Sequence, residues 1–303
     1  MNISRDLRLV FIIPTKGRYQ ELKSLIDSID RQTLKPNLVI VLDSNTQYSK
    51  NNLNSYTFPL RYIHTGPNSL TEARNIGIKN IPEDFNLIGF LDDDVILYEN
   101  AVEIMVNFWR NASGDTGGAA FNIINNRKPR RLWFLKKIFL MGDYRPGNIL
   151  PSGYQTMLDK IKEDTYTKWL PGGGTVWRKD IFNEFKFDEN IKGYGFAEDL
   201  DFSYRVGKRY NLISLAGAKL IHKPHPVYGS DNISYGISEV VNRFYFINKH
   251  VEFSKILFYW ACLGKLLENM VFVILNFNFD YLRRTAGNLL GITKIAFSKR
   301  AKY

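Results

Sequence analysis

Short apolar runs alternate with helical patterns through the first half of this chain, and no other feature of the sequence limits its fold as much. Strands that alternate with helices predict a mostly parallel sheet with crossover helices on its faces. We therefore expect an α/β protein, with a loop at the Asn/Ser-rich segment 44–57. The predicted strands are Leu9–Pro14, Leu38–Asp43, Leu60–His64, Leu87–Asp92 and Gly117–Asn122, and the predicted helices are Tyr19–Gln32, Ser69–Lys79 and Glu99–Arg110.

Composition sets the class of protein and the kind of partner. With 303 residues, 45% of them hydrophobic, the chain can bury a substantial core. Its formal net charge of +11 favours an acidic partner: nucleic acid, anionic lipid or a phosphorylated small molecule. The single cysteine, Cys262, excludes an intrachain disulfide and a cysteine-based zinc site, so a reducing compartment is expected.

The N-terminus is polar and runs into an apolar segment that ends at Pro14, without the pattern of a signal peptide. We therefore expect a cytoplasmic protein. The most apolar later stretch, Ile256–Phe277, contains Lys265, Glu268 and Asn269 near its middle, which argues against a lipid-spanning helix. Membrane contact from one side stays open.

The pattern becomes helical from about residue 235, so we predict two domains, 1–234 and 235–303, the second helical and basic. One apolar stripe runs through its first long helix and must face a core, a partner helix or a bilayer surface. The excess of basic residues in 251–303 favours peripheral attachment to the inner face of the cytoplasmic membrane. The stripe consists of Ile256, Trp260, Leu263, Leu267, Met270 and Ile274.

A second basic segment, residues 127–137, brackets the apolar triplet Trp133-Phe134-Leu135. Basic side chains around such a wedge suit an anionic membrane surface or a lipid-linked diphosphate. A solvated loop folded over the sheet explains the pattern equally well. No base-stacking motif accompanies the cluster, so nucleic acid is not expected as a partner.

Three consecutive aspartates, Asp92, Asp93 and Asp94, close a predicted buried strand. Carboxylates at the C-terminal end of a strand in an α/β sheet suit a divalent cation held against a polyphosphate. In an extended segment Asp92 and Asp94 point to the same side, so they can share one ion, and Asp93 faces the other way. A polar strand end or a helix cap is the structural alternative.

Other strand ends carry groups that suit a nucleotide. Thr15 and Arg18 lie in a tight turn after the first strand, and Asp43 ends the second, where it can bind a pyrimidine or act as a cap. Arg74 and Asn75 lie early in the helix that precedes the aspartate strand. A surface salt bridge is the alternative for Arg74.

The second half adds three features. The segment Trp169-Leu170-Pro171-Gly172-Gly173-Gly174 lets backbone approach a ligand closely, or forms a simple bend. Glu198 and Asp199 begin an amphipathic helix, where the macrodipole stabilises carboxylates. His222 closes an apolar run and can complete a metal site begun by Asp94, although a structural role is common for a lone histidine.

In their order, these segments make the chain resemble the family 2 glycosyltransferases, inverting enzymes with the GT-A fold. The resemblance runs from about Leu9 to His222. It rests on five motifs, which are Ile13-Pro14-Thr15-Lys16-Gly17-Arg18, Ala73-Arg74-Asn75-Ile76-Gly77, Leu91-Asp92-Asp93-Asp94, the glycine run with Trp177-Arg178, and Ala197-Glu198-Asp199-Leu200-Asp201.

The resemblance implies a role for each site residue. Asp92 and Asp94 match the Asp-x-Asp motif that binds ribose and Mn²⁺ or Mg²⁺, and His222 matches a metal or phosphate ligand. Asp199 matches the general base of the Glu-Asp motif, with Glu198 beside it. The remaining assignments are donor contacts at Thr15, Arg18, Asp43, Arg74, Asn75, Asp92 and Asp93, and acceptor contacts at Trp169, Gly173 and Gly174.

Two departures from the family pattern limit the assignment. Asp43-Ser44-Asn45-Thr46 replaces the usual Asp-Asp-Gly-Ser, so the nucleotide is open, with a UDP-sugar favoured. The Gln-x-x-Arg-Trp motif of processive synthases is absent, which favours addition of one sugar. We expect transfer to a glycan or lipid-linked acceptor in cell-surface polysaccharide biosynthesis, by a protein that can form homo-oligomers. The alternatives are a nucleotidyltransferase and a non-catalytic glycan- or membrane-binding protein of the same fold.

Overall fold

A computed structural model describes residues 7–45, 56–125, 132–142, 145–158, 161–223 and 231–297. The chain divides into two compact units. The sheet unit comprises residues 1–127, 158–187 and 202–224, and the helical unit comprises residues 128–157, 188–201 and 225–303. Most of the predicted loop at 44–57 and part of the basic segment 127–137 lie outside the described residues.

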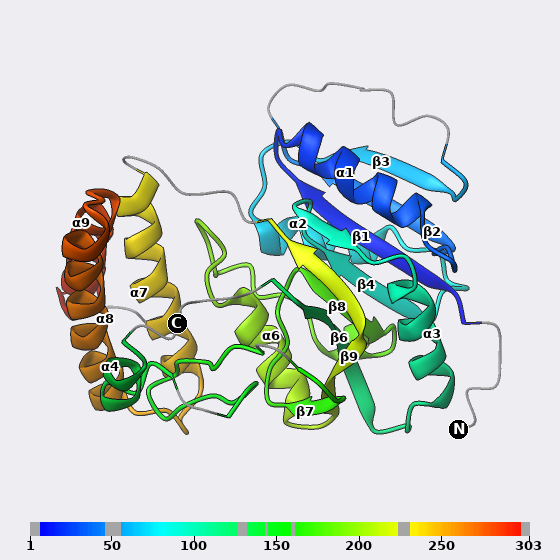
Figure 1. Cartoon of the computed structure of the whole chain (residues 1–303). Coiled ribbons are helices and arrows are strands. Elements are labelled where there is room, and N and C mark those ends of the chain that lie inside the picture. Colours follow the sequence, from blue (N-terminus) through cyan, green and yellow to red (C-terminus); the bar gives the residue numbers. More distant parts are fainter. Residues whose placement is uncertain are drawn as a thin grey trace. The chain divides into compact units, whose positions relative to one another are not determined.

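The sheet unit is built around one mixed sheet, seen edge-on at the right of Figure 1. Among the described residues its strands follow the order β3-β2-β1-β4-β8-β6-β9-β5, and β7 pairs with β9. The strands are β1 Leu9–Thr15, β2 Leu38–Asp43, β3 Leu60–His64, β4 Leu87–Leu91, β5 Val95–Leu97, β6 Thr116–Ile123, β7 Thr165–Thr167, β8 Gly174–Arg178 and β9 Asn211–His222.

Helices cover the sheet and make up most of the other unit. α6 starts in the helical unit and continues into the sheet unit. The helices are α1 Tyr19–Asp30, α2 Leu70–Lys79, α3 Ala101–Asn111, α4 Trp133–Ile138, α5 Ile181–Glu184, α6 Glu198–Gly207, α7 Asp231–Lys249, α8 Lys255–Asn276 and α9 Asp280–Phe297.

The first four strands confirm the predicted parallel sheet. β2 pairs with β1 and β3, and β1 pairs with β4, all in parallel. β8 then enters antiparallel between β4 and β6, so the sheet is mixed from that point on. Because parallel strands end at the same edge, Thr15, Asp43 and the aspartates after β4 reach one edge of the sheet.

Two cores lie on the two faces of the sheet. β1 is buried along its whole length, as expected for a central strand covered on both faces. Phe11 and Ile13 pack with residues of α1 and α3, whereas Val10 and Ile12 pack with Phe182 and residues of α6 on the other face. This alternation follows from the period of two in a strand.

The helical unit contains α7, α8 and α9, which run side by side at the left of Figure 1. The described parts of segments 128–157 and 188–201 belong to the same unit and contact α7, and α4 also contacts α8. Arg243 of α7 donates to the Gly153 carbonyl at 2.7 Å, and Lys249 bonds Asp188 at 2.6 Å. The predicted division into 1–234 and 235–303 stays a prediction, and the two compact units themselves are discontinuous.

Candidate functional site

The three aspartates lie in a turn at the carboxyl edge of the sheet. β4 ends at Leu91, and the amide of Val95 donates to the carbonyl of Asp92 at 3.3 Å. The expectation of an extended segment here is wrong, because the chain reverses at once to start β5. The turn still brings Asp92 and Asp94 together, with ligand atoms that lie within 4.8 Å of each other and of His222.

His222 reaches this edge from the end of β9. Antiparallel pairing sets Val95 opposite His222, and the imidazole Nε2 lies 3.1 Å from Asp94 Oδ1. Asn125 fixes the histidine backbone from both directions, since it accepts from the His222 amide at 2.9 Å and donates to its carbonyl at 2.6 Å. Sequence reasoning missed Asn125, because only the tertiary structure brings it to β9.

The contact between Asp94 and His222 sets the charge of both groups. Burial opposes ionisation of Asp94, but the hydrogen bond from His222 and the charges of His222 and Arg18 outweigh it and hold the pKa of Asp94 below its usual range. Burial also opposes protonation of His222, and the bond to Asp94 outweighs it and raises the pKa of His222. Each group therefore favours the charged form of the other.

Asp93 is fully buried and faces the turn after β1. It accepts a hydrogen bond from Thr15 Oγ1 at 2.7 Å, and Arg18 Nη2 lies 3.0 Å from its Oδ1. Burial raises the pKa of Asp93 to about 7, although Arg18 and Thr15 act in the opposite direction. Asp93 therefore connects the turn after β1 to the end of β4 and contacts Arg18 at the site. A direct contact of Asp93 with a donor stays a prediction.

Two arginines approach the carboxylates. Arg18 also contacts Asp94 at 3.3 Å, and Arg74 Nη2 lies 3.3 Å from Asp92 Oδ1. Arg74 is 1% exposed and its guanidinium lies over the ring of Phe187. It is not the surface salt bridge that was the alternative, because burial against an aromatic ring fixes its direction.

Asn75 binds protein backbone. Its amide group donates to the carbonyl of Phe187 at 2.9 Å and accepts from the amide of the same residue at 3.1 Å. This pair fixes the phenylalanine on which Arg74 lies. A direct contact of Asn75 with a donor stays a prediction.

The glycine run approaches Asp92 closely. The Asp92 amide donates to the Gly173 carbonyl at 3.3 Å, and a Cβ at position 173 would overlap the Asp92 side chain. A Cβ at Gly174 would meet Leu220 instead. Trp169 is 2% exposed, so its ring is part of the core in this structure. Acceptor contacts at these three positions stay predictions.

Asp43 occupies the same edge, at the end of β2. It is buried, accepts the hydroxyl of Tyr62 and accepts the amide of Asn45 at 2.9 Å. Tyr62 was not identified from the sequence. Its position on the predicted strand Leu60–His64, next to the strand that ends at Asp43, could have indicated this contact. The Tyr62 hydroxyl fixes the orientation of the Asp43 carboxylate.

Glu198 and Asp199 begin α6, as predicted, and belong to the helical unit. Ala197 precedes them with φ of 66°, and the Leu200 amide donates to Asp199 Oδ1 at 2.8 Å. Two residues on, Asp201 is fully buried and bonds Lys249 Nζ at 3.0 Å and His250 Nε2 at 3.2 Å. The start of α6 is thus tied to the end of α7.

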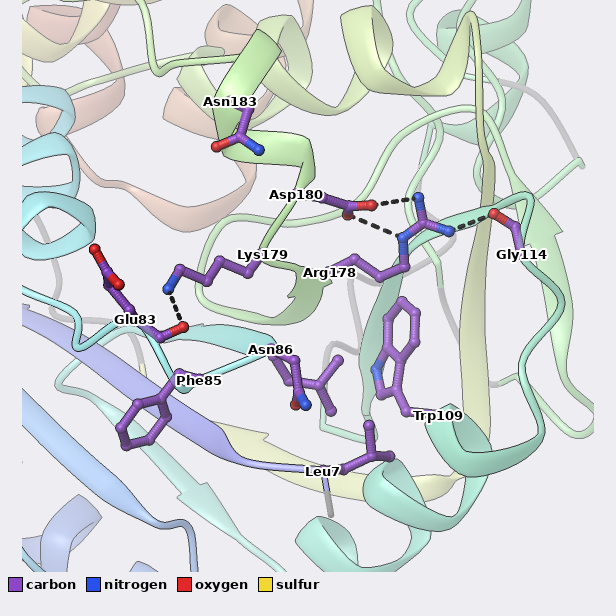
Figure 2. A pocket seen from close by; sticks show the side chains of 11 residues that line it. Leu7, Glu83, Phe85, Asn86, Trp109, Gly114, Arg178, Lys179, Asp180 and Asn183 are labelled. Carbon is purple, nitrogen blue, oxygen red and sulfur yellow. Dashed lines mark hydrogen bonds and ion pairs between the residues drawn. The ribbon is translucent and has the colours of Figure 1, made fainter. Parts of the chain in front are cut away.

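A cavity of about 620 Å³ lies elsewhere, at the opposite edge of the sheet. It is lined by residues near the start of β1 and β4, including Leu7 and Asn86, and by the loop after β8 (Figure 2). Arg178 there is paired with Asp180, and Lys179 donates to the Glu83 carbonyl at 2.8 Å. The cavity is therefore separate from the aspartate edge.

The donor set at the aspartate edge fits a divalent cation. Two carboxylates and an imidazole offer one oxygen or nitrogen each within 4.8 Å. Oxygen ligands suit Mg²⁺ and Mn²⁺, and an imidazole is more usual for Mn²⁺. With Arg18 and Arg74 beside them, these residues can hold a cation together with an anionic ligand.

Comparison with known proteins agrees with this arrangement. The family model described as "Glycosyl transferase family 2" matches residues 10–181. The chain is 25% identical over 217 residues to the Minor teichoic acid biosynthesis protein GgaA of Bacillus subtilis (strain 168). The aligned region covers 67% of this chain and 44% of the relative. The chain thus spans less than half the length of that protein.

Solved structures share the fold. The mannosyltransferase PcManGT from Pyrobaculum calidifontis, in complex with GDP-Man and Mn²⁺, has a TM-score of 0.58 and 13% identity, with 98% of this chain and 89% of that chain covered. S. aureus TarS has a TM-score of 0.52 and 14% identity, covering 92% and 55%. This similarity places the sheet and its helices among GT-A folds.

Proposed function

The chain belongs to glycosyl transferase family 2, and on that basis we propose that it is a metal-dependent, inverting enzyme that transfers one sugar from a nucleotide-diphosphate donor. One observation carries the proposal. Asp92, Asp94 and His222 converge at the carboxyl edge of the sheet, with Arg18 and Arg74 beside them. An edge with this composition suits a diphosphate and its counter-ion.

The donor diphosphate is assigned to this edge. Mn²⁺ or Mg²⁺ held by Asp92, Asp94 and His222 would supply stabilisation of the negative charge that develops on the leaving phosphate. Arg18 and Arg74 add positive charge at the same place, and the fixed position of Arg74 over Phe187 means that little reorganisation is required. Thr15, Asp43 and Asn75 are assigned to the nucleoside side, with a UDP-sugar favoured.

The base is assigned to Asp199, with Glu198 beside it. The carboxylate takes the proton of the acceptor hydroxyl while that oxygen forms a bond to the anomeric carbon. The bond from that carbon to the diphosphate oxygen breaks, and its electron pair leaves with the nucleoside diphosphate. A single displacement of this kind inverts the anomeric centre. The place of Asp199 in the first turn of α6 supports the charged form, because a helix N-terminus stabilises a carboxylate.

The acceptor is proposed to be a glycan or a lipid-linked saccharide of a cell-surface polymer. The similarity to a teichoic acid biosynthesis protein supports this pathway, over the part of that protein that the chain spans. Trp169, Gly173 and Gly174 are the proposed acceptor contacts.

Calorimetric titration of UDP, GDP and dTDP, with and without Mn²⁺, tests the donor site. We expect one nucleotide to bind in a metal-dependent manner, and Asp94→Asn to abolish that dependence. The matched control is Asp84→Asn, which removes an exposed carboxylate paired with Arg8 away from this edge. Absence of binding for all three nucleotides under both conditions would contradict the proposal.

The base is tested separately. Asp199→Asn should retain metal-dependent nucleotide binding and lose transfer, because donor binding and proton removal use different residues. If Asp199→Asn transferred sugar at the rate of the native protein, another residue would be the base.

A further inference from the structure

α8 presents an apolar side to solvent. Its exposed positions from 256 to 275 are all apolar or aromatic, and its buried residues are Phe258, Ala261, Cys262, Gly264, Glu268 and Asn269. The outer stripe of α8 consists of Ile256, Trp260, Leu263, Leu267, Met270 and Ile274, each at least 40% exposed. A surface helix normally turns its apolar side to the core.

The exposed apolar residues are concentrated in one unit. Among the described residues, all the large hydrophobic side chains that are exposed lie in the helical unit, with the exceptions of Tyr98 and Tyr166. A contiguous exposed apolar surface of this kind marks an interaction site. The sheet unit has no comparable surface in its described part.

α4 extends the outer stripe. The Trp260 indole donates to the Ile138 carbonyl at 2.9 Å, and its ring stacks on Phe139 at 4.7 Å. Ile138 is 57% exposed, and Trp133 and Phe134 at the start of α4 are about half exposed. The aromatic wedge predicted from the sequence and the outer stripe therefore belong to one surface, which we call the α4–α8 face.

The charges on these elements are basic. Lys137 of α4 and Lys255 of α8 are exposed. In α4, α8 and α9 the acidic residues are Glu268, which is buried, and Asp280, which pairs with Arg283 at 2.8 Å, and the exposed Glu252 lies in the turn before α8. Because α4 and α8 themselves carry exposed lysines and no exposed acid, two copies of the face would bring like charges together across a two-fold axis. The face complements an anionic surface.

The inner side of α8 shows why the helix would lie on a bilayer and not cross it. α8 is the one described helix that is long and apolar enough to cross a membrane. Its inner side, however, holds a polar seam with α7: Lys265 contacts Glu268 at 3.1 Å and Glu239 at 3.5 Å. α9, which packs beside it, carries Arg283, Arg284 and Lys294. A spanning arrangement would place those charges at hydrocarbon depth, at a large cost.

We propose that the α4–α8 face binds the surface of an anionic lipid bilayer, with α8 in the plane of the membrane and its outer stripe in the acyl boundary. Trp133, Tyr259 and Trp260 suit the headgroup level of a bilayer, because each has an apolar ring and a polar group that can hydrogen-bond to water. The proposal does not depend on the glycosyl transfer proposed above.

Co-sedimentation of the full chain with vesicles tests the proposal. Vesicles of phosphatidylcholine with phosphatidylglycerol should bind the protein, and pure phosphatidylcholine vesicles should bind it less. The triple variant Ile256→Gln, Leu267→Gln, Ile274→Gln should lower binding to the anionic vesicles by at least about tenfold, because three apolar groups no longer enter the acyl region. These positions are exposed, so the fold should be retained, as circular dichroism would show.

A double variant in the sheet unit supplies the control. Tyr98→Gln with Tyr166→Gln removes two exposed aromatic side chains that do not belong to the α4–α8 face, and binding should stay within about twofold of the native protein. Lys137→Gln with Lys255→Gln should weaken binding to anionic vesicles more than binding to neutral vesicles, since it lowers the electrostatic attraction.

Three outcomes would overturn the proposal. The first is unchanged binding of the stripe variant. The second is absence of vesicle binding by the native chain together with a dimer that the stripe variant dissociates, which would assign the face to a second copy. The third is resistance of the bound chain to extraction with alkaline carbonate, which would indicate a spanning helix.

Discussion

Both units bury carboxylates beside cations, and they do so with opposite results. At the aspartate edge, Asp92, Asp93 and Asp94 face two arginines and a histidine, and burial raises the pKa of Asp93 to about 7. In the helical unit, Glu239 and Glu268 face Lys265 and Lys136, and these lysines outweigh burial and keep the pKa of Glu268 low.

The numbers of acids and basic groups match in both places: three aspartates lie beside two arginines and a histidine, and two glutamates lie beside two lysines. The difference lies in the effect of burial. At the edge, burial of Asp93 outweighs Arg18 and Thr15 and raises the pKa of Asp93, whereas in the seam the lysines outweigh burial and lower the pKa of Glu268. Carboxylates with raised pKa values are concentrated at functional sites, and fully paired ones are common in structural networks.

Asp94→Asn is the strongest test of this difference. The variant should lose about 1–3 kcal/mol of stability, because the contacts with His222 and Arg18 that lower the pKa of Asp94 are weakened, and it should still fold. Transfer should fall by about a thousandfold or more, because stabilisation of the leaving phosphate is lost. Single-turnover product formation and urea unfolding measure the two effects. A stable variant with normal transfer would remove the edge from the reaction.

Lys265→Met should give the reverse result in the helical unit. Two buried glutamates lose a shared cation, so the free energy of unfolding should fall by about 3 kcal/mol. Nucleotide binding should not change. Arg283→Met, which breaks the exposed pair with Asp280, is the control and should cost less than about 1 kcal/mol. Equal losses in the two variants would show that the seam contributes no more than a surface pair.

A pair of glycines sharpens the comparison. A Cβ at Gly264 would overlap Phe139, so Gly264→Ala should destabilise the helical unit by about 2 kcal/mol. A Cβ at Gly173 would overlap Asp92, so Gly173→Ala should weaken metal-dependent nucleotide binding about tenfold. Gly114→Ala, where the new Cβ meets no atom within 4 Å, is the control for both measurements. Loss of binding without Asp92 displacement in a crystal structure of the variant would refute the explanation.

The pH dependence of unfolding separates two buried aspartates by sign. The raised pKa of Asp93 means that its stabilising contribution is complete below the unfolded value near 3.8 and is lost as pH rises through about 7. The difference in unfolding free energy between the native protein and Asp93→Asn should therefore fall by about 1 kcal/mol per pH unit between pH 4 and 7.

Asp188 should behave in the opposite way. Burial opposes its ionisation, but bonds from Lys249, the Asn190 amide and Tyr245 lower the pKa of Asp188 to about 2. Its contribution is present above pH 3.8 and is lost as the pH falls through about 2. Urea unfolding of Asp93→Asn and Asp188→Asn across the pH range should give slopes of opposite sign, and equal slopes would contradict the assigned shifts.

Local patterns in the sequence determined the first four strands, the helices between them and the residues at the strand ends. Continuous apolar runs and helical periodicity are short-range signals, and the parallel edge then follows from topology alone. For that reason, the approach of Asp92, Asp94 and Arg74 to one another could be predicted from the sequence. His222 was expected from its place at the end of an apolar run, and the family resemblance agreed with it.

Tertiary structure decided the rest, because it depends on contacts between segments far apart in the chain. Pairing across the sheet produced three features of the site. They are the turn at Asp92–Asp94 in place of an extended segment, the hydrogen bonds between Asn125 and the His222 backbone, and the hydrogen bond from Tyr62 to Asp43. The stripe of α8 was visible in the sequence, but periodicity does not say which side of a helix faces solvent. The tertiary structure decided this, because it buries Phe258, Ala261, Glu268 and Asn269 and leaves the stripe exposed.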